Sequence, residues 1–147
     1  MTEQGKISLV NRVNILSDAG AQMALEAAAD EARRNGWRVC IAVVDAAGHL
    51  LAFRRMDGTA VASILGAQEK ARSAAQIHLP TEEFQAAIDS GRPSYLGIHW
   101  IVSLEGGVPI VVADAVVGAV GASGVEAHQD AQIARAGVGA VTSSLRG

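Results

Sequence analysis

Aromatic side chains and cysteines are scarce in this sequence. Five of its 147 residues are Phe, Trp or Tyr, and Cys40 is the single cysteine. A disulfide within the chain is therefore impossible, and the cysteine content gives no indication of an oxidising compartment. Half of the residues are hydrophobic. Because alanine and valine make up much of that half, the helices and strands must pack closely.

The sequence also lacks a large net charge and a long apolar run. Its formal net charge is −3, with acidic and basic residues interleaved, so it has no basic patch that would bind a nucleic-acid backbone. No apolar run reaches the roughly 20 residues that a membrane-spanning helix needs, and residues 1–8 lack the apolar core of a secretory signal. We therefore expect no nucleic-acid partner, no membrane partner and a cytoplasmic location.

The chain length fits one domain over residues 1–147. Ser17 has a side chain suited to the N-cap of a helix, and Gly36 is suited to follow a helix end. Between them, apolar residues recur at spacings of four and three on one helix face, at Ala21, Leu25, Ala28 and Ala32. This pattern predicts a helix over residues 17–34.

The middle of the chain predicts a β-hairpin and then two helices. Residues 39–44 are rich in β-branched side chains, and residues 45–48 have Asp and Gly where a type I turn prefers them, so residues 49–56 are expected to return as a second strand. The alanine-rich stretch from Thr59 to Ala74 predicts a helix. Thr81 and the acidic residues after it predict the start of a shorter one.

The last third predicts three strands, over residues 99–104, 108–113 and 116–122, and a final helix over residues 126–145. Strands and helices come in blocks with short connections, which favours an α+β domain. We predict a five-stranded, mainly antiparallel sheet flanked by helices, with the profilin-like order α-β-β-α-α-β-β-β-α.

Polar residues at the end of the predicted hairpin form a candidate ligand-binding site. Arg54, Arg55, Met56 and Asp57 lie at the end of the second strand, and Lys70 and Arg72 lie on the next helix. Arginine binds a carboxylate through two parallel hydrogen bonds and lysine binds it as a point charge, so this cluster can hold a carboxylate or a propionate, with Asp57 orienting the cations. The alternative is a solvated rim of salt bridges without function.

A second candidate is the glycine-rich segment over residues 118–124. Ser123 and Gly124 form a turn ahead of the last helix, where backbone N–H groups can donate to an anion. The glycine spacing does not make a dinucleotide fingerprint, and no strand follows the helix to complete a βαβ unit. The competing interpretation is close strand packing and helix entry.

The histidines give candidates for acid/base catalysis. Imidazole titrates near neutral pH, so His99 and His128 are candidate catalytic groups together with the Glu126 carboxylate. None of the four histidines has a partner at metal-ligand spacing, and Glu126, His128 and Asp130 spread around a helix, so we predict no metal site.

Several segments together carry a family resemblance. They are residues 41–48 (IAVVDAAG), 55–58 (RMDG), 69–74 (EKARSA), 106–110 (GGVPI), 117–124 (VGAVGASG) and 129–137. In these segments, and over nearly the whole chain from Ser8 onward, the sequence resembles the GlcG/HbpS-like family, which includes the C-terminal domain of PduO-type proteins.

The resemblance implies a five-stranded antiparallel sheet and assembly into dimers that build tetramers or octamers. Members of the family are associated with haem, with corrinoid-related proteins and with operons of small-molecule catabolism. Haem is thus a candidate cofactor, although no axial haem ligand maps onto a position of this chain. The sequence departs from secreted members in lacking an export segment, and it has His99–Trp100 where many relatives are apolar.

The leading hypothesis is a cytoplasmic homo-oligomer, whether dimer, tetramer or octamer, that binds a small acidic or tetrapyrrole-like ligand near Arg55, Asp57, Lys70 and the Ser123–Gly124 turn. One alternative is a cofactor-free lyase, hydratase or tautomerase acting on a small carboxylated substrate. Another is a partner-binding module without a pocket.

Overall fold

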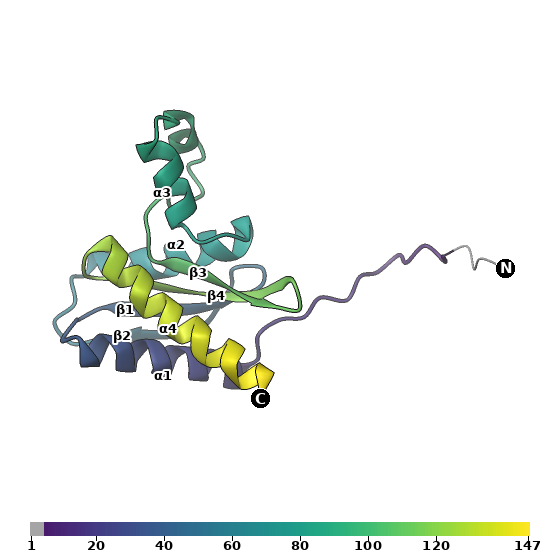
Figure 1. Cartoon of the computed structure of the whole chain (residues 1–147), viewed down its shortest axis with the longest axis horizontal. Coiled ribbons are helices and arrows are strands. Elements are labelled where there is room, and N and C mark those ends of the chain that lie inside the picture. The colour runs from purple at the N-terminus through teal and green to yellow at the C-terminus, as the bar shows by residue number, and fades with distance from the viewer. Residues whose placement is uncertain (1–4) are drawn as a thin grey trace.

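Four antiparallel strands form the sheet of this computed structural model, which describes residues 5–147 (Figure 1). The strand order is β2-β1-β4-β3. In chain order the elements are α1 (Asp18–Arg34), β1 (Cys40–Asp45), β2 (Leu50–Arg55), α2 (Ala62–Ile77), α3 (Glu82–Asp89), the 3-10 helix η1 (Pro93–Gly97), β3 (Gly107–Val112), β4 (Ala115–Ser123) and α4 (Ala127–Arg146). The predicted α+β class is confirmed.

Helices cover both faces of the sheet. α1 and α4 lie side by side on one face and α2 lies on the other (Figure 1). The predicted start of α1 is confirmed, because the Gly20 N–H donates to the Ser17 hydroxyl at 3.1 Å. The apolar face of α1 is buried and consists mainly of alanine, at Ala21, Ala24, Ala28, Ala29 and Ala32. Small side chains let α1 and α4 approach each other closely above the sheet.

The contact between α2 and the sheet is closer still. At Gly121 in β4, a Cβ atom would lie 2.2 Å from the Ala67 carbonyl oxygen and 2.5 Å from the Ala71 nitrogen, both in the backbone of α2. No side chain fits in that space, so glycine is required there. The alanine-rich composition seen in the sequence is thus explained by two tightly packed helix layers.

The predicted strand over residues 99–104 is wrong, and the sheet has four strands instead of five. Side chains, not a neighbouring strand, bind the backbone of this segment. Arg72 donates to the Trp100 carbonyl oxygen at 2.6 Å, the Val102 N–H donates to the Ser73 hydroxyl at 2.9 Å, and Thr81 donates to the Leu104 carbonyl oxygen at 2.6 Å. The apolar residues of the segment therefore form turns over the end of α2.

Residues 79–105, which include α3 and η1, stand away from the sheet (Figure 1); we call them the projection. Neither α3 nor η1 contains a buried residue. Phe84 and Tyr95 pack edge to face, with ring centroids 5.1 Å apart. This aromatic pair and hydrogen bonds such as Glu105 N–H to Gln85 hold the projection together. The projection is joined mainly through its two ends to residues 16–78 and 106–147, which we call the body.

Residues 5–15 form an extended arm that runs away from the sheet and from the projection (Figure 1). The arm joins the body at Leu16, whose N–H donates to the Val117 carbonyl oxygen at 2.9 Å. In residues 5–147, no helix is long and apolar enough to cross a membrane.

Candidate functional site

Strand pairing brings the predicted ligand-binding residues to one end of the sheet. Cys40, the first residue of β1, lies opposite Arg55 in β2 and opposite Ser123 in β4. The residues that follow Arg55 and Ser123 along the chain therefore leave the sheet at the same end. Met56 and Asp57 follow β2 there, and Gly124 follows β4.

Two turns meet at this end of the sheet. The Met56 N–H donates to the Val39 carbonyl oxygen at 3.1 Å, and the Thr59 hydroxyl donates to the Met56 carbonyl oxygen at 2.7 Å, which fixes the turn after β2. Gly124 has a φ of 146°, and a Cβ atom there would lie 2.6 Å from the Arg38 carbonyl oxygen. Glycine therefore lets the turn after β4 pack directly on the chain that enters β1.

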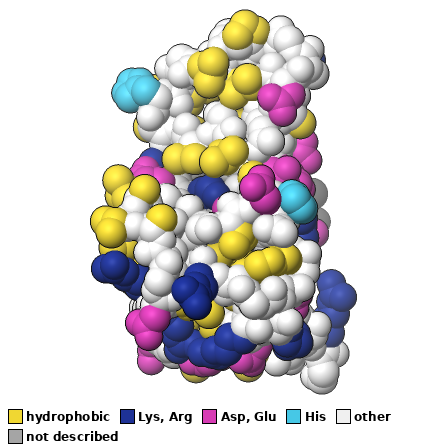
Figure 2. Space-filling model, turned by 90° about the vertical axis from the view of Figure 1, so that its left-hand side faces the viewer, with side chains coloured by type: hydrophobic (Ala, Val, Ile, Leu, Met, Phe, Trp, Pro, Cys, Tyr) yellow, Lys and Arg dark blue, Asp and Glu magenta, His cyan; other side chains and the backbone are white. Residues whose placement is uncertain are grey.

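A pocket of about 380 Å³ opens at this end of the sheet. Its lining contains four arginines, one methionine and one carboxylate: Arg33, Arg38, Arg54, Arg55, Met56 and Asp57. Figure 2 looks onto this end of the molecule and shows Lys and Arg side chains gathered over its lower part. We call this feature the arginine pocket.

The four arginines differ in whether they are already paired. Arg54 forms a two-pronged ion pair with Glu26 of α1, and Arg33 is 2.9 Å from the Asp30 carboxylate. Arg38 and Arg55 are exposed and have no ion-pair partner within residues 5–147. Two guanidinium groups are therefore available to an anion from solvent.

The local charges change the titration of two neighbouring groups. The hydrogen bond from Arg54 holds the pKa of Glu26 below its ordinary value, so Glu26 stays ionised and keeps Arg54 in place. Burial raises the pKa of the Cys40 thiol, and the charge of Arg55 only partly opposes this effect. Cys40 thus remains a neutral thiol beneath the strand ends, without the thiolate character of a nucleophile.

Lys70 lies inside the protein and does not line the arginine pocket. Its side chain and that of Asp130 in α4 are each 3% exposed, and the Lys70 Nζ atom is 2.9 Å from the Asp130 carboxylate. Lys70 also donates to the Ala122 carbonyl oxygen at 3.2 Å, and Asp130 accepts from the Val125 N–H at 3.2 Å. The ion pair therefore binds the backbone on both sides of the Ser123–Gly124 turn.

The buried pair carries an electrostatic cost. Burial raises the pKa of Asp130 above its ordinary value, although the hydrogen bond and the positive charge of Lys70 act in the opposite direction. A buried carboxylate of this kind depends on its partner and on its backbone donor to remain ionised. Lys70 and Asp130 therefore position the turn. Both side chains are buried, so neither can contact a ligand from solvent.

The residues expected to act in catalysis do not form a cluster with the arginine pocket. His99 is exposed and packs edge to face on Trp100, with ring centroids 5.0 Å apart. Glu126 is the N-cap residue of α4, and His128 follows in its first turn, exposed to solvent. No hydrogen bond within residues 5–147 joins His99 to either of them, and no group of three potential metal ligands occurs in that range.

Sequence reasoning missed three residues of this region. Arg33 and Arg38 line the pocket, and Asp130 neutralises Lys70. A signal for Arg38 is its place two residues before β1, since a residue there lies near the end of β2 once the hairpin forms. No local pattern could indicate the pairing of Lys70 with Asp130, because the two residues come from distant helices.

Comparison with known proteins agrees with the fold and with the family resemblance. GlcG of Escherichia coli K12 is 43% identical over 109 residues, which cover 74% of this chain and 81% of GlcG. The crystal structure of HbpS has a TM-score of 0.83 and 30% identity, covering 92% of this chain and 96% of that one. A structure described as a PduOC:heme complex has a TM-score of 0.78 and 25% identity, covering 86% and 94%.

A family model described as haem degrading protein HbpS-like matches residues 16–139. The match begins where the arm ends and includes the sheet, the projection and most of α4. Because the model covers most of the chain, and because GlcG is similar over three quarters of it, the protein belongs to the HbpS-like family.

Proposed function

We propose that this protein binds a small ligand through one or two carboxylate groups, in the arginine pocket. The observation that carries the proposal is the pair Arg38 and Arg55, two exposed guanidinium groups in one pocket without an ion-pair partner in residues 5–147. Planar guanidinium groups match carboxylates in shape and charge, and bidentate pairs of this kind are among the strong hydrogen bonds of proteins.

Arg54 supports the same role, whereas Asp57 opposes it. Glu26 holds Arg54 against α1, so Arg54 adds positive charge at a fixed position while Arg38 and Arg55 make the direct contacts. Asp57, the lining carboxylate, acts against this role, because it repels a ligand carboxylate placed beside it. The turn after Ser123 does not line the pocket, and its Val125 and Glu126 N–H groups already donate to Asp130 and Gln129.

Haem is the ligand class that the family suggests, and the pocket fits part of it. Arg38 and Arg55 suit its two propionates. The ring needs an apolar slot and the iron an axial ligand. None of the four histidines lines the pocket, and Met56 packs against the core between the sheet and helices α1 and α4. The arginine pocket thus offers partners for the acidic groups of a tetrapyrrole and no histidine for its iron.

Homo-oligomeric assembly and a cytoplasmic location stay predictions from the sequence. If a tetrapyrrole is the ligand, a second subunit is the natural source of the apolar surface that its ring requires. The enzymatic alternative gains no support from the geometry, because Glu126, His128 and His99 are not joined with the arginine pocket.

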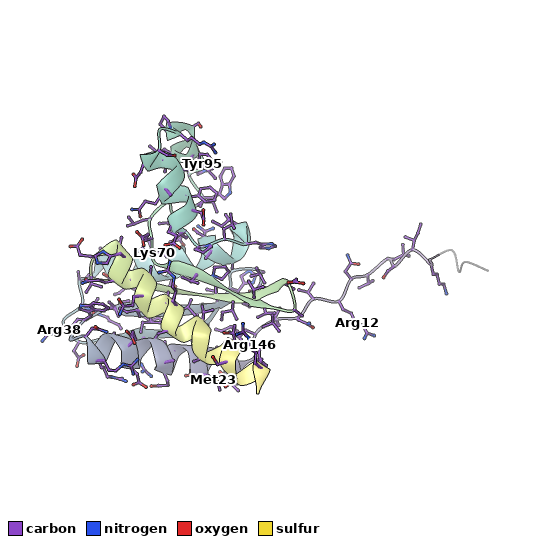
Figure 3. All side chains as sticks on the ribbon, viewed as in Figure 1. Arg12, Met23, Arg38, Lys70, Tyr95 and Arg146 are labelled. Atoms are coloured by element: carbon purple, nitrogen blue, oxygen red, sulfur yellow. The ribbon has the colours of Figure 1, made fainter. Side chains whose placement is uncertain are left out.

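Titration with hemin, followed by absorbance, and with a small dicarboxylate such as succinate, followed by calorimetry, tests the proposal. We expect Arg38→Gln and Arg55→Gln each to weaken binding of the responding ligand about 10-fold or more, since a hydrogen bond to a charged group contributes about 1.5–3 kcal/mol. Arg146→Gln is the matched control, because Arg146 lies at the far end of α4 from Arg38 (Figure 3).

Unchanged affinity in the double variant Arg38→Gln, Arg55→Gln would show that the carboxylates bind elsewhere. Affinity lost equally in Arg146→Gln would show that the effect is one of net charge and not of this pocket.

A further inference from the structure

The arm carries apolar side chains that the rest of residues 5–147 leaves largely exposed. Ile7, Leu9, Val10, Val13 and Ile15 are 59–94% exposed. Four of them, at positions 7, 9, 13 and 15, alternate with other residues as in a strand that buries one face. Such a contiguous apolar surface marks a binding segment and is unusual on a monomer.

The arm is also positively charged. Lys6 and Arg12 are its charged residues, and residues 5–15 contain no carboxylate. Figure 3 shows Arg12 on the arm, away from every helix of the body. A partner surface for the arm therefore needs apolar hollows beside negative charge.

The projection offers both features. A hollow of about 440 Å³ is lined by Leu79, Phe84 and Tyr95 among others, and it shares Glu83 with a neighbouring hollow of about 320 Å³. The projection carries four carboxylates, at Glu82, Glu83, Asp89 and Glu105, against the single arginine Arg92. Glu82 alone among the four is paired, with Arg135 of α4.

We propose that the arm of one subunit docks on the projection of a second copy of this chain. Apolar arm residues fill the hollow beside Phe84 and Tyr95, and Arg12 lies against the carboxylates of α3. The inference deepens the predicted homo-oligomer and rests on it, but it does not depend on which ligand the arginine pocket binds.

A second copy fits as the partner better than the same chain does. Figure 1 shows the arm leaving the body at Leu16 and running away from the projection. To reach its own projection the arm would have to reverse the extended course that it takes in the structure. Extended over residues 5–15, the arm spans up to about 36–40 Å, enough to lie across a neighbouring subunit.

Light scattering of the full chain across a range of concentrations tests the proposal. We expect an oligomer. In the double variant Leu9→Ser, Val13→Ser its dissociation constant should rise at least about 10-fold, because two apolar side chains that the interface buries are removed. Ser8→Ala, Asn14→Ala changes two polar positions of the same arm and should leave the dissociation constant within about 2-fold.

A charge exchange makes the test specific for the two surfaces. Arg12→Glu should weaken assembly about 3-fold to 10-fold, and Glu83→Arg should do the same, because each places like charges together. The combined variant should recover most of the loss. Recovery is not expected if the arm docks on any surface other than the projection.

Crosslinking separates docking between subunits from docking within one. Leu9→Cys and Leu79→Cys, made in separate chains and mixed under oxidising conditions, should give a disulfide-linked dimer; buried Cys40 is a poor competitor. A monomer in light scattering would overturn both the homo-oligomer prediction and this inference. An oligomer unaffected by the arm variants would overturn this inference alone.

Discussion

The body of the protein and its projection use their apolar residues in different ways. In the body, two layers of small side chains close on the sheet, and most alanines of α1 and α2 are completely buried. In the projection, α3 and η1 bury no residue, although three of the five aromatic side chains of the chain, Phe84, Tyr95 and Trp100, lie there.

This difference separates residues that fold the chain from residues that bind partners. Tight packing makes the body sensitive to a change of one methyl group or one charge. The projection has its apolar surface outside, so substitutions there should alter association more than folding. Measured free energies of unfolding can test this division, beginning with the change of largest expected effect.

The Lys70–Asp130 pair should be the most sensitive point of the body. Lys70→Met keeps most of the side-chain volume but leaves the Asp130 carboxylate buried without its partner. We expect a loss of about 3–5 kcal/mol in the free energy of unfolding, the usual cost of breaking a buried ion pair. Urea unfolding at pH 7, followed by circular dichroism, measures it.

Lys6→Met is the matched control for this variant, because Lys6 is the only other lysine of the chain and lies on the arm. It should change the free energy of unfolding by less than about 0.5 kcal/mol. The loss in Lys70→Met should shrink as the pH falls toward the ordinary carboxyl pKa of about 4, since protonated Asp130 carries no buried charge. A loss equal to that of Lys6→Met would mean that the pair contributes nothing to folding.

Gly121 is surrounded by backbone atoms of α2, whereas Gly139 has free space around it. Alanine substitutions at these two positions of the body should therefore have opposite effects. Gly121→Ala places a Cβ atom 2.2 Å from the Ala67 carbonyl oxygen, which must move. We expect a loss of about 1–3 kcal/mol or more from this overpacking. Gly139→Ala in α4 meets no atom within 4 Å and should stabilise the helix by up to about 1 kcal/mol. Thermal unfolding of both variants checks the opposite signs.

Local signals in the sequence predicted most of the fold. Ser17 caps α1 as expected, and the Asp45 carboxylate accepts from the Ala47 and His49 N–H groups in the predicted hairpin turn. The false strand over residues 99–104 shows the limit of such signals. Its apolar residues match a strand, but a strand also needs a partner, and the Arg72 and Ser73 side chains bind this backbone instead.

Only the part of the candidate site that is local in sequence could be predicted. Arg55, Met56 and Asp57 are neighbours in sequence, so a local pattern was enough to place them together. Arg38 joins them only through the pairing of β1 with β2. The charge of Lys70 suggested a ligand contact, whereas its burial and its bond to Asp130 depend on α4, 60 residues away in sequence.

Phe84→Ala tests whether the projection tolerates the loss of an aromatic side chain better than the body does. Phe84→Ala removes the edge-to-face contact with Tyr95, and we expect a loss of about 1 kcal/mol in the free energy of unfolding. Truncating a core phenylalanine usually costs about 3–5 kcal/mol. Chemical unfolding at a protein concentration low enough to favour the monomer gives the value. A loss of about 3–5 kcal/mol would mean that Phe84 is packed as tightly as a residue of the core.

The Glu26–Arg54 pair on the rim of the arginine pocket should have the smallest effect, because Glu26 is 53% exposed. Arg54 lowers the pKa of Glu26, so the pair stabilises the folded state above the ordinary carboxyl pKa of about 4.3, and this contribution disappears as the pH falls through the lower folded pKa. Wild type and Glu26→Gln should therefore differ slightly in unfolding free energy at pH 7 and converge once the pH has fallen below the folded pKa of Glu26. A difference that grows toward low pH would mean that Glu26 is stabilised in its protonated form, and Arg54 would then be free to bind a ligand beside Arg38 and Arg55.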